Sequence, residues 1–196
     1  METIYIKKTR DLKENLRILK EKLNVNIKVE GRKITIEGEA IDEYNAQQVF
    51  EAIQFGFTVK QSLQLTEPDM HFVKINIKKA TRRKNLEDVR SRVIGKEGKT
   101  KRTLENISGC EIVVNDNNEV GLIGPSESIE SAETGLKNVI KGSKQSNAYA
   151  YVERMNSERK KHKTTDLGLK EKSKDEESDD IDKDLEDLDD FDEDKE

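Results

Sequence analysis

Apolar and polar residues follow the same pattern in two separate stretches of the chain. Residues 24–29 and 109–114 each alternate between apolar and polar side chains, as a half-buried strand does. A polar turn and a second strand follow each stretch, and the second strand ends in glycine, at Gly38 or Gly124. We interpret this self-similarity as one supersecondary unit that is used twice.

A helical pattern follows each of these strand pairs. Apolar residues recur at the spacing of one helix face from Ala46 to Phe57 and again from Ile129 to Ile140. The apolar positions are Ala46, Val49, Phe50, Ile53 and Phe57 in the first copy, and Ile129, Ala132, Leu136, Val139 and Ile140 in the second.

A strand and a helix are also predicted ahead of each strand pair. In the first copy they are residues 3–6 and a helix whose apolar residues are Leu12, Leu16, Leu19 and Leu23. In the second copy a strand at 72–77 precedes a helix with Leu86, Val89 and Val93. Two glycines interrupt that helix. A further helix runs from Thr100 through Leu104 and Ile107 and stops at Gly109, because a glycine can take the left-handed backbone conformation that ends a helix.

These elements predict an α+β protein of two tandem modules, each a three-stranded sheet with helices on one face. Composition agrees, because 39% charged against 32% hydrophobic residues leaves little apolar material for one large core. We expect a first module at residues 1–66, a second at 67–164 that includes a C-terminal helix, and a disordered acidic tail at 165–196.

The net charge of −5 conceals two regions of opposite sign. Residues 166–196 carry 17 Asp plus Glu against 5 Lys, a net −12, which leaves +7 on the rest of the chain. Between residues 78 and 103 there are 11 Lys plus Arg against 3 Asp plus Glu, a net +8. This density of positive charge is typical of a surface that binds phosphates.

The two interrupting glycines lie inside this basic stretch, in the segment Gly95-Lys96-Glu97-Gly98. A Gly-x-x-Gly turn between two helices lets a sugar–phosphate backbone approach without obstruction by Cβ atoms, and the amides that open the next helix can face phosphate oxygens. Many helix–helix turns carry two glycines for conformational reasons alone, so the motif needs its context. Here a basic helix follows it, with Lys99 and Arg102 one turn apart.

The pattern Val-Ile-Gly-x-x-Gly-Lys at 93–99, the basic helix after it and the strand at 109–114 together resemble a KH domain of the eukaryotic-type order. The resemblance implies that the loop holds about four nucleotides of single-stranded RNA, with the bases on an apolar groove. Ile94, Ile112 and Val114 could supply the floor of this groove, or they can equally be ordinary core residues. Lys96 and Glu97 can simply lie in water. The RNA-binding residues expected on this basis are Arg92, Ile94, Gly95, Lys96, Glu97, Gly98, Lys99, Thr100, Arg102, Ile112 and Val114.

Four stretches narrow the resemblance to the small-subunit rRNA-processing KH family of archaea and eukaryotes, the partner-of-Nob or Dim-type factors. They are residues 55–58, 92–105, 121–125 and 149–154. The resemblance implies a protein that binds the 3′-end region of small-subunit rRNA during maturation. It also implies ribosome-assembly partners, such as a 3′-end endonuclease and an rRNA dimethyltransferase, in the cytoplasm, or in the nucleolus of a eukaryote.

The chain departs from this family's pattern in two places. Residues 7–24 contain no glycine, where the family would place a loop of its own. We therefore expect two tandem KH domains of which the first is degenerate, packs against the second and has no independent groove. The long acidic tail is the second departure.

Several function classes find no support in the sequence. Cys110, His71 and His162 are the only cysteine and histidines, so neither a metal-ligand cluster nor a nucleophile–histidine pair is expected, and we expect no enzyme and no cofactor. Cys110 itself is expected to be a small buried thiol. No apolar stretch reaches the ~20 residues of a membrane span, and the N-terminus lacks a signal pattern. Two alternatives remain, a KH adaptor that recruits proteins and a KH regulator that binds mRNA or single-stranded DNA.

The C-terminal end of the body offers a helix from Ala148, with Tyr149, Val152 and Met155 on one side, and then a basic run at 159–163. The run is either a solvated helix end or a further RNA contact. Beyond it, the tail is a solubilising segment, a transient helix that a partner captures, or an intramolecular competitor for the basic surface. The apolar residues of that transient helix are Ile181, Leu185, Leu188 and Phe191.

Deleting residues 166–196 tests the competitor hypothesis. Because the deletion removes a net charge of −12, we expect tighter binding of nonspecific RNA and a changed salt dependence, both measured by filter binding over a range of KCl concentrations. Unchanged affinity and an unchanged salt slope would leave only the other two roles.

Overall fold

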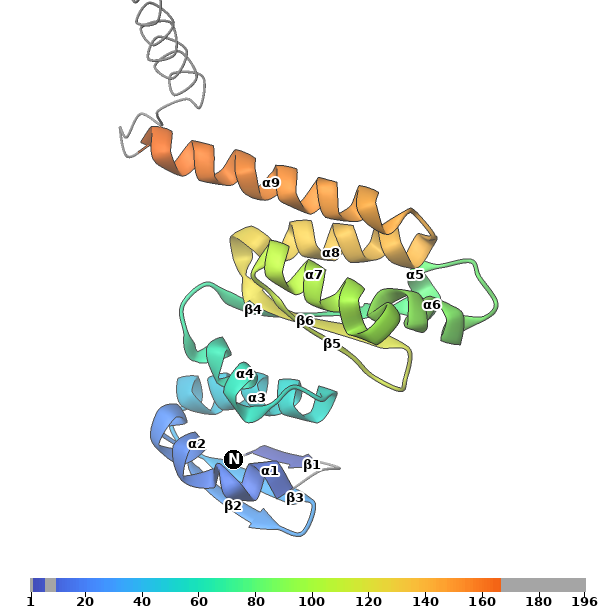
Figure 1. Ribbon diagram of the computed structural model, residues 1–196. Helices are drawn as coiled ribbons and strands as arrows, with labels where there is room; N and C mark the ends of the chain where they lie inside the picture. Colours follow the sequence, from blue (N-terminus) through green and yellow to red (C-terminus); the bar gives the residue numbers. More distant parts are fainter. Residues whose placement is uncertain (1, 6–9, 167–196) are drawn as a thin grey trace, which may run out of the picture. The chain divides into compact units, whose positions relative to one another are not determined.

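The computed structural model describes residues 2–5 and 10–166, with side chains for Ile4 and residues 12–161. The described residues form two antiparallel three-stranded sheets, and in each the strand that comes last in the chain lies at the centre (Figure 1). The repeated order confirms that one plan is used twice. The strands are β1 (Glu2–Tyr5), β2 (Asn26–Glu30) and β3 (Lys33–Glu37) in the order β1-β3-β2, then β4 (Met70–Asn76), β5 (Glu111–Val114) and β6 (Glu119–Pro125) in the order β4-β6-β5.

Helices occupy the positions that the apolar periodicity predicts, with two short helices added. The first module contains α1 (Arg10–Glu14), α2 (Leu16–Leu23), α3 (Ala40–Phe55), α4 (Val59–Ser62) and a 3₁₀ turn (Leu63–Thr66). The second contains α5 (Ile77–Ala80), α6 (Leu86–Ile94), a 3₁₀ turn (Lys96–Gly98), α7 (Lys99–Ser108), α8 (Ser126–Lys141) and α9 (Gln145–Asp166).

No loop separates the first two helices of the first module. The amide of Asn15 donates to the carbonyl oxygen of Leu12, and its own carbonyl oxygen accepts from Leu19, so α1 passes into α2 through one residue. The second module has a four-residue loop at the corresponding place. The absence of glycine in the first module therefore coincides with the absence of a loop between α1 and α2.

The C-terminal end of α3 differs from the predicted helix. Gly56 takes a φ of 130°, and its amide donates to the carbonyl oxygens of Ala52 and Ile53, which ends the helix at Phe55. Phe57 therefore lies beyond the helix, and its placement on the helix face was wrong. Its ring belongs to a cluster shared with the second module.

The core of the second module lies between its sheet and the helices α6, α7 and α8 (Figure 1). Val93, Leu104 and Leu136, one from each helix, are buried against Leu122 at the centre of β6. The helix α9 adds the buried Ala148 and Val152 to the same core. It approaches α8 closely at Gly135, where a Cβ atom would lie 2.6 Å from a methyl carbon of Val152.

The other face of the second sheet is covered by the first module. Phe57 and Ala52 pack against the buried Ile123 of β6, and the ring of Phe72 on β4 meets that of Phe57 edge-on, with centroids 5.7 Å apart. Gly121 leaves room for these rings, because a Cβ atom there would lie 2.6 Å from Phe55. The expected packing between the modules is confirmed. The first module covers the face of the second sheet that the helices of the second module leave uncovered.

Polar bonds join the same two surfaces. Gln61 in the first module donates through Nε2 to a carboxylate oxygen of Glu111 on β5 at 2.7 Å. Lys74 on β4 pairs with Glu51 on α3 and lies 5.2 Å from the centroid of the Phe72 ring. Two sheets with separate cores are thus joined into one compact unit that ends at Asn156.

The predictions for the acidic tail fall on residues that lie outside the described part of the chain. None of the helices within residues 10–166 is long and apolar enough to span a membrane.

Candidate nucleic-acid interface

The loop between α6 and α7 depends on left-handed backbone conformations. Gly95 has φ 75° and ψ 173°, a combination that is essentially restricted to glycine, while Glu97 and Gly98 have φ values of 55° and 74°. An added Cβ atom at Gly95 would lie 2.1 Å from Oγ1 of Thr100 and 2.7 Å from the Thr100 amide nitrogen. Glycine is therefore required at position 95 both for the backbone angles and for the close approach to α7.

The second glycine of the motif has a different environment. An added Cβ atom at Gly98 would meet only Nε of Arg102, at 3.9 Å, so the space beside this residue is open. Gly95 thus holds the loop against α7, and Gly98 presents bare backbone to the solvent. The second position is the one where a sugar–phosphate backbone can approach.

The amide of Gly98 and the first of the amides expected to face phosphate, that of Lys99, are used inside the loop. The amide of Gly98 donates to the carbonyl oxygen of Gly95 at 3.1 Å, and the amide of Lys99 donates to the carbonyl oxygen of Lys96. For Lys99 the prediction was wrong, because the 3₁₀ turn satisfies this donor locally. For the amides that follow it in α7 the prediction stays untested, and the cationic side chains around the loop offer further attraction for an anion.

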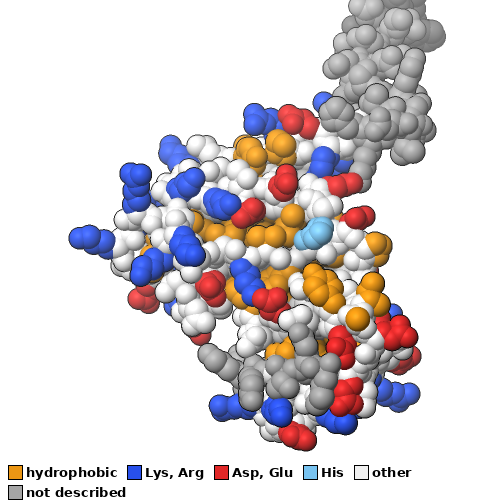
Figure 2. All heavy atoms as spheres, turned by 180° about the vertical axis from the view of Figure 1, so that it is seen from behind, with side chains coloured by type: hydrophobic (Ala, Val, Ile, Leu, Met, Phe, Trp, Pro, Cys, Tyr) orange, Lys and Arg blue, Asp and Glu red, His pale blue; other side chains and the backbone are white. Residues whose placement is uncertain are grey.

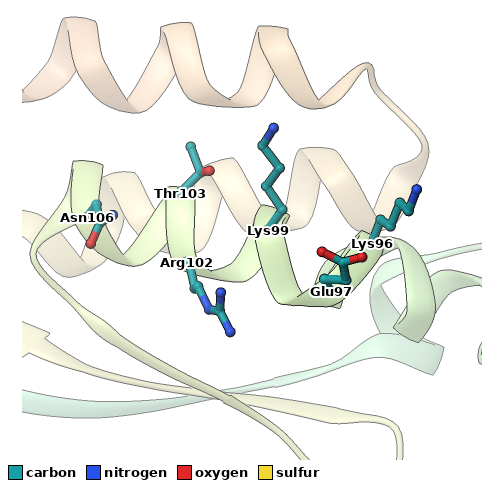
Figure 3. Close-up of a pocket in the computed structure, with 6 residues that line it drawn as sticks. All are labelled: Lys96, Glu97, Lys99, Arg102, Thr103 and Asn106. Atoms are coloured by element: carbon teal, nitrogen blue, oxygen red, sulfur yellow. The ribbon is translucent and has the colours of Figure 1, made fainter.

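Those side chains line a pocket of about 350 Å³ beside the loop and α7 (Figure 3). Lys99 and Arg102 are exposed and leave α7 in different directions, with Arg102 turned toward the strands. Neither these two nor Lys96 forms an ion pair with another residue in the described part of the chain, whereas the neighbouring Lys101 pairs with Glu105 at 3.0 Å. The pocket is lined by Lys96, Glu97, Lys99, Arg102, Thr103 and Asn106.

The proposed apolar floor is only partly exposed. The side chain of Ile112 is fully buried in the second core, so for this residue the core-packing alternative is correct. Ile94 and Val114 are half-buried and keep some surface beside the loop and on β5. Cys110 is buried, as expected for a small packed thiol.

Arg92 and Thr100 hold the loop in place. The guanidinium of Arg92 donates from Nη2 to the carbonyl oxygens of Gly142, at 3.0 Å, and of Ser143. Gln145 donates from Nε2 to Oγ1 of Thr100 at 2.8 Å and to the carbonyl oxygen of Arg92 at 3.3 Å. Arg92, whose guanidinium is hydrogen-bonded to backbone carbonyls, and the buried Thr100 are therefore positioning residues. Direct contact of Thr100 with RNA is not supported.

Gln145 was not predicted as a site residue. Its bond to Thr100 joins positions 45 residues apart, and glutamine at the start of a helix has no periodicity or motif that marks it. We name this group of hydrogen bonds, made by Arg92, Thr100, Gln145 and the carbonyls of Gly142 and Ser143, the loop brace.

The basic stretch of the sequence separates into two surfaces. One is the loop and α7. The other is α5 and the segment after it, where a stretch of seven residues contains five exposed Lys and Arg residues. Figure 2 shows Lys and Arg side chains gathered along one side of the second module. These five are Lys78, Lys79, Arg82, Arg83 and Lys84.

Comparison with protein families matches residues 71–157 to the second KH domain of PNO1, described as a eukaryotic-type KH domain (KH-domain type I). The match contains the loop, α7 and the whole second sheet except Met70. The first module lies outside it, so this comparison does not show that the chain has two KH domains.

Two curated proteins resemble the chain in sequence. A KH domain-containing protein of Methanocaldococcus jannaschii is 29% identical over 133 residues, which are 67% of this chain and 57% of that protein. The RNA-binding protein PNO1 of Oryzias latipes is 30% identical over 110 residues, 55% of this chain and 45% of that protein. The chain thus matches about half the length of each.

Solved structures extend the likeness to both modules. A protein of unknown function from Aeropyrum pernix has a TM-score of 0.72 at 25% identity and covers 85% of this chain and 96% of its own. Dim2p of Pyrococcus horikoshii has a TM-score of 0.69 at 24% identity, over 78% and 98%. The Dim2p of a P. horikoshii complex with a/eIF2alpha and rRNA has a TM-score of 0.69 at 22% identity and covers 80% of this chain and 94% of its own. Because the last two structures are less than 25% identical to the chain, they show a shared fold alone.

The two glycines of the loop are expected to respond differently to substitution. Gly95→Ala should lower the free energy of unfolding by about 2–4 kcal/mol, because it adds backbone strain to a steric overlap with Thr100. Gly98→Asn should cost less than about 1 kcal/mol, since asparagine tolerates left-handed angles and the space is open. Urea unfolding measures both, and equal losses would contradict the different roles of the two positions.

Proposed function

Because the chain belongs to the PNO1/Dim2-type family of KH proteins, we propose that it is an RNA-binding protein that acts in the biogenesis of the small ribosomal subunit. The proposed ligand is a single strand of rRNA near the 3′ end of the small-subunit rRNA, held by the second module. We propose this role as a non-catalytic one, in the cytoplasm or, in a eukaryotic cell, the nucleolus.

One observation carries the proposal, the open backbone at Gly98 among unpaired cations. Lys96, Lys99 and Arg102 surround the loop without an ion-pair partner among the described residues, and Gly98 offers no Cβ atom to an approaching chain. A phosphate that reaches this point meets positive charge and no steric barrier. The half-buried Ile94 and Val114 offer apolar surface for unstacked bases.

The relatives support the choice of rRNA over other nucleic acids. The Dim2p of Pyrococcus horikoshii has been solved in a complex with a/eIF2alpha and rRNA, and its fold matches 80% of this chain. On the ground of the family resemblance in the sequence, we also propose ribosome-assembly proteins as partners, including a 3′-end endonuclease and an rRNA dimethyltransferase.

The first module has a supporting role in this proposal. It lacks a loop between α1 and α2, and its α3 end covers the sheet face opposite the helices of the second module. It stabilises the sheet that carries β5, while the RNA contacts come from the second module.

The variant Gly98→Asp tests the groove. It places a carboxylate in the open space beside the loop, so we expect at least a tenfold loss of affinity for a small-subunit rRNA 3′-end oligonucleotide, measured by fluorescence anisotropy. Gly98→Asn is the matched control, because it has nearly the same shape without the charge.

The same assay discriminates the alternatives. The parent protein should prefer the rRNA oligonucleotide over a scrambled RNA and over single-stranded DNA of the same sequence. Equal binding of all three would favour a protein that binds single strands without regard to sequence. If Gly98→Asp bound the rRNA oligonucleotide as tightly as the parent, the binding site would lie elsewhere than at the loop. An adaptor of proteins would bind none of them.

Removal of single cations from α7 tests the phosphate contacts. Lys99→Ala and Arg102→Ala should each reduce the slope of log affinity against log salt by about 0.7–1, since each removes one phosphate contact. Lys101→Ala is the control on the same helix, because Glu105 already pairs with Lys101. A slope that falls equally in all three variants would indicate a diffuse electrostatic effect.

A further inference from the structure

A second pocket is lined in part by residues of the loop brace, Arg92 and Gln145. Its volume is about 500 Å³, within the range of pockets that hold small ligands, and it adjoins the end of α6 and the beginning of α9. It is separate from the pocket beside α7, with which it shares no residue. Its lining consists of Arg92, Lys144, Gln145, Ser146 and Tyr149.

The lining of this pocket favours an anion. Two cations, an amide and two hydroxyls face it, and no carboxylate lines it. Arg92 is bonded to two neutral carbonyl oxygens and to no carboxylate among the described residues, so its positive charge is not cancelled. Lys144 is exposed and free to reach a ligand, and Ser146 adds a hydroxyl donor from the first turn of α9.

The pocket is connected to the loop through the brace. Gln145, which lines it, donates to Thr100, and Thr100 is the residue against which Gly95 is packed. Figure 3 shows Lys99 directed away from the strands, on the side of α7 that faces α9. Positive side chains therefore continue from the proposed RNA groove toward this pocket.

The positive surface also continues beyond the pocket. The guanidinium of Arg83 lies against Gly142, where an added Cβ atom would be 2.5 Å from its Nη2, so Arg83 and Arg92 meet at the same residue. Arg83 belongs to the cations on α5 and the segment that follows it. The loop, the pocket and this basic segment thus form one path of positive charge over the end of the module.

We infer that this pocket is a second phosphate-binding subsite, which holds a phosphate of the same RNA strand outside the nucleotides in the groove. The inference rests on the proposed function and extends it, because the bound RNA becomes longer than the roughly four nucleotides that a KH groove holds. Lys144 supplies a positive charge on a flexible side chain, and Ser146 donates a hydrogen bond. Arg92 adds a positive charge whose position is fixed by its hydrogen bonds.

Lys144 is the residue to vary, because Arg92 also holds the carbonyls of Gly142 and Ser143 and its loss would disturb the loop. The probes are random-sequence RNA tetramers and octamers, which report backbone contacts averaged over sequence. The full-length parent protein should bind the octamer more tightly than the tetramer by at least tenfold.

Lys144→Glu should remove most of this gain and leave tetramer affinity within about twofold of the parent. Lys144→Ala should reduce octamer affinity about threefold to tenfold and lower the salt slope by about 0.7, the value for one single-strand contact. Lys141→Glu is the control, since it makes the same charge change three residues away at an exposed position that does not line the pocket.

Three results are distinguishable. Loss of the octamer gain in Lys144→Glu alone supports the subsite. Equal losses in Lys144→Glu and Lys141→Glu, or a parent that binds both lengths equally, would overturn the subsite and leave the groove intact. A parent that binds neither random-sequence RNA would also overturn the subsite, because the subsite is a backbone contact that does not depend on sequence. The proposed function is tested separately, by binding of the rRNA 3′-end oligonucleotide to the parent.

Discussion

The close approach of Gly95 to Thr100 is the contact on which the rest of the site depends. It requires a backbone conformation that side chains exclude. The loop brace stabilises it with hydrogen bonds from Arg92 on α6 to the end of α8, and from Gln145 on α9 to Thr100 on α7 and to the carbonyl oxygen of Arg92. These bonds hold the loop on the side that faces α8 and α9, so its outer edge at Gly98 stays open. They also fix the position at which α7 begins, and with it the positions of its cationic residues. A mobile glycine loop would lose more conformational entropy on binding a nucleic acid than this one.

Packing between the modules supports the same site from the opposite side of the sheet. The central strand β6 is buried on both faces, with Val120 and Leu122 in the second core and Ile123 against Phe57 of the first module. The helices of the second module bury one face of its sheet, and the first module buries part of the other face. This explains how a module without a glycine loop remains useful to a protein whose site lies elsewhere.

Much of the fold was predictable because it follows from local patterns. Strand alternation and helical spacing gave the repeated order, and Gly109 ended α7 with a φ of 68°, as expected. The site was predictable as far as the glycines and exposed cations. The burial of Thr100, the engagement of Arg92 and the role of Gln145 were not, because each depends on a partner that is distant in the chain and on neither spacing nor composition. For Ile112 the sequence left burial as one of two alternatives, and the structure decides for it. The end of α3 was missed because the apolar spacing continues through Gly56 to Phe57, although the chain leaves the helix there.

The central claim is that a single strand of RNA lies along the open edge of the loop and the exposed side of α7. A titration of the ¹⁵N-labelled protein with a small-subunit rRNA 3′-end oligonucleotide, followed through backbone amide shifts, tests it most directly. The largest shifts should fall on residues 94–103 and on β5, with little change in the strands of the first module. Shifts confined to the first module, or spread evenly over both, would contradict the account.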